Sequence, residues 1–367
     1  MLHYAIACRY DKATSSSAFV RKNAIACINL MSYMFSLQVY PHTIHLTSIL
    51  EPYILLQLAE SAENADASEF VHLVRQADYI LQSGRRRKSI AGGQVNGGLI
   101  QVYDMENLVI ISDLHGDSKS LFRILSEINY KQFLSKELNK LVFLGDYIDR
   151  GNDSLSIVYS VCYLKSIYPD SVILMRGNHE APAEFPFSPH NFPYEIEDRF
   201  GNRWREIYKE TLSMFRLLTL ATVVKHKLLI VHGGLPTKES AAANFRESIA
   251  FAQESQVTNS VLEELLWNDP LPIDETRSRE TSRRGFGTYF GPSVTRNWLQ
   301  ATGTMAVVRG HEPCQGFRLD HDNKVMTLFS CVSPYPNSAA AYLIVNATKL
   351  DAINDAKELS VHVKFLV

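Results

Sequence analysis

Short apolar runs alternate with amphipathic stretches from residue 99 onward. The apolar runs have the length of buried strands. They lie at Leu108–Ile111, Leu141–Leu144, Val172–Met175, Lys227–Val231 and Met305–Val308, with late strands of a second sheet expected at Lys324–Phe329 and Ala341–Val345. Helices are predicted at Lys119–Asn129, Asp153–Ile167, Trp204–Leu220, Ser260–Trp267 and Gly291–Thr302, and an irregular loop at Glu184–Tyr194. This alternation predicts an α/β class with a parallel sheet and helices packed on it.

The first part of the chain has a different pattern. Leu46–Gly84 repeats apolar residues at helical spacing, which predicts two or more amphipathic helices. Gly84–Gly98 is basic and glycine-rich, and we interpret it as a solvated linker, with a nuclear address or a phosphorylation site at Ser89 as the alternative. We therefore predict an N-terminal, mainly helical extension with its linker (1–98), an α/β domain (99–345) and a C-terminal segment (346–367). The extension has no cluster of chemistry-bearing residues, so we expect a packing or regulatory element rather than a second enzyme.

Composition places the chain among soluble globular proteins. It has 367 residues, of which 46% are hydrophobic and 21% charged, and its formal net charge is -2. This charge gives no electrostatic reason for nucleic acid or an anionic membrane to be the main partner. The five cysteines form no C-x-x-C pair, which indicates reduced thiols in an intracellular protein, cytoplasmic or, if the basic run is an address, nuclear. Asn23–Leu50 has no charged side chain, but its many polar groups favour a buried segment over a membrane anchor.

Polar residues of metal-binding type follow five of the predicted strands. They are Asp113 and His115, Asp146, Asn178, His232 and His311. Open α/β sheets bind ligands at the carboxyl ends of their strands, and glycines beside these ends allow tight turns that bring them together. Oxygen and nitrogen ligands without a thiolate suit manganese, iron or zinc. Six ligands are too many for one ion with an open position, so we predict two divalent ions that share one carboxylate.

The motifs around these residues resemble the phosphoprotein phosphatase (PPP) family of serine/threonine phosphatases, within the calcineurin-like metallophosphoesterases. The family pattern G-D-x-H-G, G-D-x-x-D-R-G and G-N-H-E is found at Ser112–Gly116, Gly145–Gly151 and Gly177–Glu180. Later family elements are found at Val231–Leu235, Leu266–Pro270, Arg284–Gly291 and Arg309–Glu312. The resemblance covers Leu108–Tyr335 and implies a sandwich of two mixed β-sheets flanked by helices.

The resemblance also implies a role for each residue. Asp113 and His115 would hold one ion, Asp146 would bridge both, and the other ion would be held by Asn178, His232 and His311. Arg150 and Arg284, with Asn178 and Tyr335, would bind the phosphate. His179, oriented by Asp149, would protonate the leaving group after attack by a hydroxide bound to the two ions. Asp269 matches a family acid near the site and would support Arg284 or the residues around the metal ligands.

Three departures from the family pattern stand beside the predicted site. Ser112 replaces a glycine, Asp117 stands where many members have glutamine, and Ser330–Pro336 differs from the family's S-A-P-N-Y-C. The loop Glu184–Tyr194 also departs and borders the predicted cleft. The expected function is metal-dependent hydrolysis of phosphate monoesters, with phosphoserine and phosphothreonine of proteins as substrates and regulatory proteins as further partners. A symmetrical dinucleoside-polyphosphate hydrolase and an inactive phosphate-binding scaffold are the alternatives.

Overall fold

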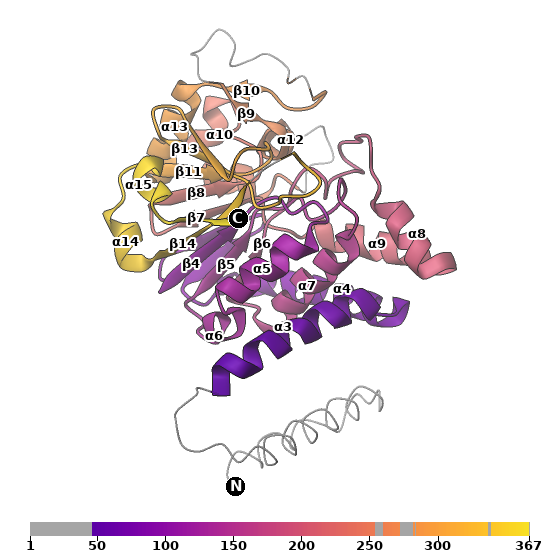
Figure 1. Cartoon of the computed structure of the whole chain (residues 1–367). Helices are drawn as coiled ribbons and strands as arrows, with labels where there is room; N and C mark the ends of the chain where they lie inside the picture. Colours follow the sequence, from indigo (N-terminus) through magenta and orange to yellow (C-terminus); the bar gives the residue numbers. More distant parts are fainter. Residues whose placement is uncertain (1–45, 254–259, 272–281, 283, 337–338, 367) are drawn as a thin grey trace. The chain divides into compact units, whose positions relative to one another are not determined.

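Two β-sheets lie at the centre of the fold (Figure 1). The structure is a computed structural model that describes residues 46–253, 260–271, 282, 284–336 and 339–366. The chain divides into two units, Met1–Leu50 and Glu51–Val367, and the architecture below is that of the second. Of the uncharged stretch Asn23–Leu50, residues 23–45 lie outside the described residues. Within the described part, no helix is long and apolar enough to span a membrane.

The first sheet has five strands in the order β15–β14–β4–β5–β6. Their bounds are β4 (Asn107–Ile111), β5 (Lys140–Phe143), β6 (Val172–Leu174), β14 (Ala340–Asn346) and β15 (Val363–Leu366). Strands β4, β5 and β6 run parallel to one another, as the sequence predicts. The assignment of Ala341–Val345 to a second sheet was wrong, because β14 pairs antiparallel with β4, Leu343 opposite Ile110. An apolar run reveals a buried strand but not the strand it pairs with.

The second sheet has eight strands in the order β1–β2–β3–β7–β8–β11–β13–β12. Their bounds are β1 (Ser89–Ile90), β2 (Gly93–Asn96), β3 (Leu99–Val102), β7 (Ala221–Val224), β8 (Leu228–Val231), β11 (Ala306–Arg309), β12 (Phe317–Asp320) and β13 (Val325–Leu328). Strands β8, β11 and β13 run parallel to one another. A further ladder joins β9 (Asp269–Pro270) to β10 (Tyr289–Phe290). The expected fold of two mixed sheets is therefore confirmed.

The inner strands of both sheets are buried on both faces, which explains why their sequences are continuous apolar runs. In β4, Leu108 and Ile110 face the second sheet, whereas Val109 and Ile111 face the helices. In β8, Leu228 and Ile230 share the core between the sheets. Figure 1 shows the resulting order of layers, from α10 and α13 through the two sheets to α5 and α7.

Helices cover the outer face of each sheet. On the side of the five-stranded sheet lie α3 (Leu46–Asn64), α4 (Ala67–Arg87), α5 (Ser118–Glu127), α6 (Tyr130–Leu134), α7 (Ser154–Ile167), α8 (Phe192–Phe200) and α9 (Trp204–Phe215), with a 3-10 turn at Gly201–Arg203. The remaining helices are α10 (Glu239–Ala243), α11 (Phe245–Ala250), α12 (Ser260–Trp267), α13 (Pro292–Thr302), α14 (Ala347–Ala352) and α15 (Ala356–Ser360). Helix α8 begins inside the predicted irregular loop, with Pro193 in its first turn, a position where proline loses no hydrogen bond.

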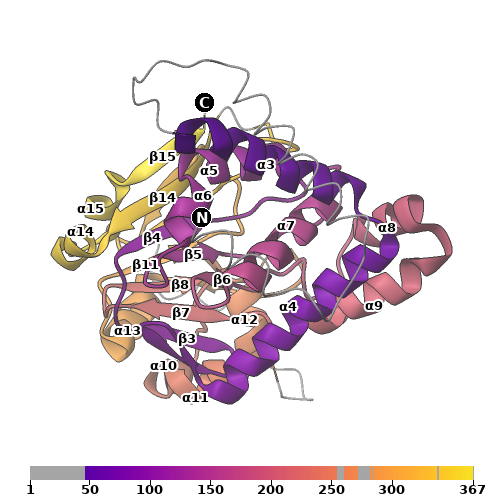
Figure 2. The same cartoon turned by 90° about the horizontal axis from the view of Figure 1, so that it is seen from below.

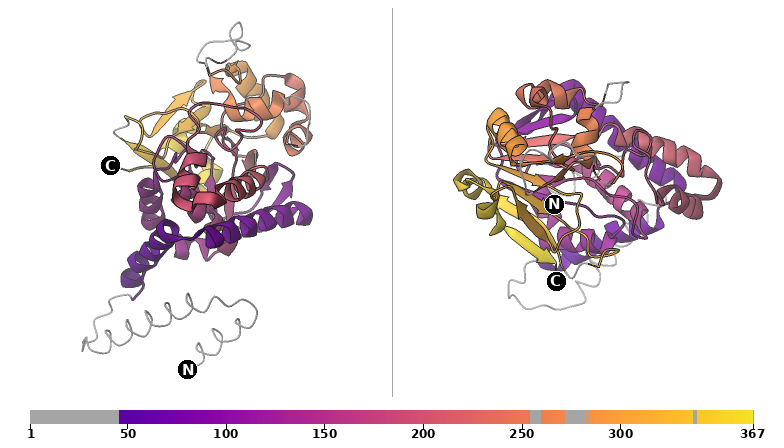
Figure 3. Two further views of the ribbon diagram at one scale, coloured as in Figure 1. Left: turned by 90° about the vertical axis from the view of Figure 1, so that its right-hand side faces the viewer. Right: turned by 90° about the horizontal axis from the view of Figure 1, so that it is seen from above.

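Helix α4 packs along α7 and α9 (Figure 2, Figure 3). Its apolar face, which includes Phe70, Val74 and Ala77, is buried in the same core as the outer face of the five-stranded sheet. The linker interpretation of Gly84–Gly98 was wrong. After α4 ends, β1 and β2 form the edge hairpin of the eight-stranded sheet, and Gly97 takes a φ of 53° at the turn into β3. Here glycine serves a tight turn rather than a mobile connection.

Candidate metal centre

The loops that follow β4, β5, β6, β8 and β11 meet at one place, beyond the carboxyl ends of these strands. Gly145 and Gly177 allow two of these loops to touch. A Cβ on Gly145 would lie 2.2 Å from the backbone nitrogen of Gly177, and a Cβ on Gly177 would lie 2.2 Å from Oδ1 of Asp146. No side chain fits in either position, so the glycines of these motifs are required by the close approach of the loops.

The backbone at this place is strained. Five residues that carry functional side chains have a left-handed φ: His115 (44°), Asp146 (52°), Asp149 (68°), Arg150 (68°) and His311 (70°). Residues with a Cβ rarely adopt this conformation, and it persists where the surrounding structure enforces it. The strain indicates that the positions of these side chains, rather than local stability, determine the shape of the loops.

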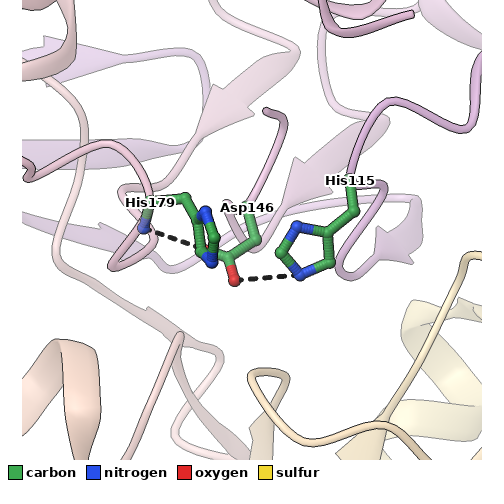
Figure 4. A group of neighbouring side chains, drawn as sticks. All are labelled: His115, Asp146 and His179. Atoms are coloured by element: carbon green, nitrogen blue, oxygen red, sulfur yellow. Dashed lines mark hydrogen bonds and ion pairs between the residues drawn. The ribbon is translucent and has the colours of Figure 1, made fainter. Parts of the chain in front are cut away.

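Asp146 lies at the centre of the cluster (Figure 4). Its Oδ2 is 3.3 Å from Nε2 of His115, and its Oδ1 is 3.3 Å from Nε2 of His232. Oδ1 also accepts a hydrogen bond of 3.1 Å from the backbone N–H of His179. The carboxylate thus faces the imidazole of His115, from a loop of the first sheet, and that of His232, from a loop of the second sheet.

The other nitrogen of each of these two imidazoles is held by the backbone. Nδ1 of His115 is 3.1 Å from the carbonyl of Ile148, and Nδ1 of His232 is 3.1 Å from the carbonyl of Leu144. A carbonyl only accepts, so Nδ1 carries the proton in both rings and Nε2 of a neutral ring presents a lone pair. Two nitrogen lone pairs are therefore aimed at the oxygens of Asp146.

Asn178 and His311 lie next to Asp146 and His232. One terminal atom of the Asn178 amide is 3.1 Å from Nε2 of His232 and 2.9 Å from Nδ1 of His311, and as the amide nitrogen it donates to both rings and to Asp146. The other ring nitrogen of His311, Nε2, is buried and has no hydrogen-bond partner among the described residues. Nε2 of His115 and Nε2 of His232 still present lone pairs to the oxygens of Asp146, and such lone pairs repel unless a positive charge lies between them.

Asp113 lies on the far side of His115. Its Oδ2 is 3.9 Å from Nε2 of His115, and its carboxylate accepts hydrogen bonds from the backbone N–H of His311 and from the hydroxyl of Ser112. Ser112, which replaces a family glycine, therefore orients a predicted ligand. The structure also brings His179 within reach of His115 and Asp146, a grouping that the sequence does not predict.

Electrostatics favour a cation at this place. Burial lowers the pKa of His115 to about 4 and that of His232 to about 3, so both rings are neutral at pH 7. Burial and then the charge of Asp113 raise the pKa of Asp146 well above its ordinary value. Neutral imidazoles and carboxylates are the protein ligands of divalent metals. The donor set and its backbone-held histidines fit a divalent metal centre.

His179 and Asp149 form a hydrogen-bonded pair beside the cluster. Nδ1 of His179 is 2.8 Å from Oδ2 of Asp149, and both side chains are buried. Burial, opposed by hydrogen bonds from His179 and His190, leaves the pKa of Asp149 below its usual range, so it is a carboxylate. Nδ1 of His179 therefore carries the proton, and its Nε2 is the nitrogen that remains for other contacts.

The two arginines reach the same pocket. Arg150 lines it and has no hydrogen bond or ion pair with any described residue. Arg284 donates from Nε to Oδ2 of Asp269 at 2.9 Å, while Oδ1 of Asp269 accepts from the fully buried Arg309 at 2.9 Å. Asp269 thus holds the guanidinium of Arg284 at Nε, which leaves the edge with the terminal nitrogens (the outer edge) for a ligand.

The pocket in front of the cluster has a volume of about 740 Å³. His115, Asp146, Asn178, His179 and His311 lie along it, with aromatic walls from Phe187, Trp267, Phe286 and Tyr335. The ring of Tyr335 lies beside that of His115, with centroids 5.5 Å apart and the ring planes tilted by 52°. Its loop is held by Asp117, which caps α5 and also accepts from the backbone N–H groups of Val332 and Ser333.

The structure thus brings together the residues that the sequence singles out, while three contributors went unpredicted. Glu180 accepts hydrogen bonds from the backbone N–H groups of Asp146, Tyr147 and Gly177 and so ties two loops together. Phe187 lies over His179, with ring centroids 4.3 Å apart. His190 contacts Asp149. The last two lie on the loop that departs from the family pattern, where only its place beside the cleft could have pointed to them.

Comparison with known proteins agrees with the fold and the motifs. Residues 107–315 match the model of the calcineurin-like phosphoesterase family, and the chain belongs to this family. Among its curated relatives is serine/threonine-protein phosphatase T of Schizosaccharomyces pombe, which is 33% identical over 63% of this chain and 47% of its own length. Serine/threonine-protein phosphatase 5 of Arabidopsis thaliana is 32% identical over 63% of this chain and 41% of its own.

The resemblance to serine/threonine phosphatases that the motifs indicate is confirmed by these relatives. The chain spans less than half the length of either one. A solved structure from Saccharomyces cerevisiae, described as a protein serine/threonine phosphatase similar to human phosphatase PP5, has the same fold. It superposes with a TM-score of 0.61 at 23% identity and covers 81% of this chain and 88% of its own.

Proposed function

We propose that this protein hydrolyses phosphate monoesters, and that its substrates are phosphoserine and phosphothreonine side chains of proteins. The observation that carries the proposal is that ring nitrogens of His115 and His232 face the carboxylate of Asp146 in a pocket that two arginines also line. A cation-binding cluster next to guanidinium groups suits a phosphate, whose oxygens need positive charge on several sides. The names of the relatives support a protein substrate.

The metal ligands of the proposal are those expected from the motifs. Asp113 and His115 would hold one ion, Asn178, His232 and His311 the other, and Asp146 both. When bound, the two divalent ions, for which manganese, iron or zinc suits this ligand set, would supply positive charge to the phosphate and lower the pKa of water.

The side chains around the pocket would orient the substrate. Arg150 and the outer edge of Arg284 would each donate hydrogen bonds to phosphate oxygens in a fixed plane. Tyr335 stands across the pocket and would contact the phosphate or its ester. Phosphoryl transfer needs mainly this positioning and charge stabilisation, since the transferred group makes little covalent contact with the protein.

His179 would supply the proton that the departing oxygen needs. A serine alkoxide is a poor leaving group, and a general acid within hydrogen-bond reach typically contributes about 10²–10⁴-fold. Because Nδ1 of His179 donates its proton to Asp149, the proton for the leaving group would come from Nε2. Burial lowers the pKa of His179 to about 3, so the ring would have to take up its second proton with the substrate before the step, and the negative charge of Asp149 would stabilise that form.

An add-back assay tests the proposal. The metal-free full chain is supplied separately with manganese, iron, zinc and magnesium, and turnover of a phosphoserine peptide, a phosphothreonine peptide and a diadenosine polyphosphate is measured. We expect metal-dependent release of phosphate from both peptides and far slower turnover of the dinucleotide. Faster turnover of the dinucleotide would identify a dinucleoside-polyphosphate hydrolase, and metal binding without turnover of any substrate would identify an inactive scaffold.

A further inference from the structure

Asp149 contacts a second histidine besides His179. Nδ1 of His190 is 2.9 Å from Oδ2 and 3.2 Å from Oδ1 of the same carboxylate. Oδ1 also accepts hydrogen bonds of 2.7 Å and 2.9 Å from the backbone N–H groups of Asn191 and Phe192. Four donors therefore surround one buried carboxylate, which leaves it no alternative orientation.

The protons of this network can be assigned from its geometry. Asp149 is an acceptor only, so both imidazoles present an N–H at Nδ1, whichever charge His190 carries. Nε2 of His190 is 2.9 Å from the hydroxyl of Tyr208 on α9. A neutral His190 accepts from Tyr208 there, and a charged His190 donates to it. Tyr208, His190, Asp149 and His179 thus form one chain of hydrogen bonds that ends at the metal centre.

The loop that carries His190 also encloses this chain. Phe187 packs its ring 4.3 Å from the ring of His179 and 5.3 Å from that of His190, and it lines the pocket. The side chain of His190 is only 15% exposed. If His190 only fixed the loop at the surface, its second ring nitrogen would not need a hydrogen bond to a tyrosine of another helix.

We propose that His190 is a positioning residue, which holds Asp149 and, through Asp149, keeps the ring of His179 aimed at the leaving group. This inference rests on the proposed role of His179 as the general acid. Without His190, Oδ2 of Asp149 would have His179 as its one donor among the described residues, and Oδ1 would keep only the backbone N–H groups of Asn191 and Phe192, so the carboxylate could tilt away from His179. A small displacement of a catalytic group can lower a rate by up to about 10²-fold.

Three variants of the full chain test the proposal. His190→Phe keeps a ring beside Phe187 but removes both hydrogen bonds. His190→Asn can place an amide N–H near the position of Nδ1 and so restore the donor to Asp149. Tyr208→Phe keeps the ring and removes the hydroxyl. His72→Phe, at an exposed position of α4, is the matched control for replacing a histidine by phenylalanine.

We measure kcat and KM on a phosphoserine peptide and on 4-nitrophenyl phosphate, whose leaving group needs little protonation. We expect His190→Phe to lower kcat on the peptide by about tenfold or more, with KM little changed and a clearly smaller loss on the aryl phosphate. His190→Asn should recover most of the loss, Tyr208→Phe should lose less than His190→Phe, and His72→Phe should match the wild type. Equal losses on both substrates, or no recovery in His190→Asn, would reduce His190 to a structural contact and overturn the proposal.

A second measurement separates this inference from the proposed function. In metal-free protein, the Nδ1–H proton of His179 is followed by NMR, with the signal assigned by its loss in His179→Asn. We expect a slowly exchanging proton in the wild type and faster exchange in His190→Phe, irrespective of turnover. Unchanged exchange would refute the positioning role, whereas a wild type without turnover that still shows the difference would refute only the proposed function.

Discussion

Replacing Gly177 by alanine is the sharpest test of how the metal centre is built. The added Cβ would lie 2.2 Å from Oδ1 and 2.4 Å from the backbone nitrogen of Asp146, and 2.7 Å from Oε2 of Glu180. Contacts under 3.0 Å do not occur for real Cβ atoms, so Asp146 and residue 177 must move apart by about 0.8 Å. Neither neighbour can move independently, because Glu180 binds the backbone of both loops.

The expected effects follow from this displacement. Overpacking of a rigid site costs about 1–3 kcal/mol of stability. A shift of nearly 1 Å at the shared carboxylate should lower kcat/KM by about 10²-fold and loosen the metals. The assay combines urea unfolding, metal content by mass spectrometry after dialysis, and kcat/KM on 4-nitrophenyl phosphate.

Gly84→Ala is the matched control, because it makes the same chemical change where nothing lies within 4 Å of the new Cβ. Gly84 lies inside α4, so alanine should stabilise the protein by about 0.5–1 kcal/mol without changing the kinetics. If Gly177→Ala retains full metal content and wild-type kcat/KM, the close approach of the two loops does not position Asp146 and the reasoning fails.

Four further outcomes are expected. Asp146→Asn should reduce metal content and remove turnover by several powers of ten, and activity within about tenfold of wild type with metals bound would exclude a shared ligand. His179→Asn should keep the metals and lower kcat by about 10²–10⁴-fold on phosphoserine but less on aryl phosphates; equal losses would argue against the acid role. Arg284→Lys loses the planar fork and should lower kcat/KM, whereas unchanged kinetics would leave Arg284 as a partner of Asp269 alone. Burial lowers the pKa of Lys165 to about 8 from 10.5, so between these pH values the unfolded chain holds more protons than the folded protein. The free energy of unfolding should therefore rise with pH in this range, by up to about 3 kcal/mol relative to Lys165→Met, as measured by urea titrations at pH 7.5 and 10. Equal changes with pH in the two proteins would contradict this.

The sequence predicts the strands and the metal ligands for the same physical reason. Strands buried on both faces must be apolar throughout, so the polar residues Asp113, Asp146 and His232 stand out where the strands end. The glycines beside them mark the contacts between loops. These signals are local in the chain, and the three-dimensional site follows once the strands are parallel.

Features that depend on long-range pairing were not predictable in this way. The pattern of Ala341–Val345 is that of a buried strand, yet nothing in it specifies β4 as the neighbour. The hairpin of β1 and β2 is short and polar, because the edge of a sheet needs little apolar cover. Its sequence therefore has the pattern of a linker. His190 has no counterpart in the family motifs, and its contact with Asp149 arises from the course of a proline-rich loop.

The left-handed backbone at His115, Asp146, Asp149, Arg150 and His311 sets selection for activity against selection for stability. At such positions glycine or asparagine relieves conformational energy, on the order of 1 kcal/mol per residue, that other side chains must bear. Each replacement of this kind would relieve backbone strain while removing a functional group, and at Asp149 it would also leave the buried N–H groups of Asn191 and Phe192 without their acceptor. A descendant lineage released from the need for turnover should therefore drift toward glycine or asparagine at these five positions first, and homologues that carry such changes would be candidates for stable, non-catalytic paralogues.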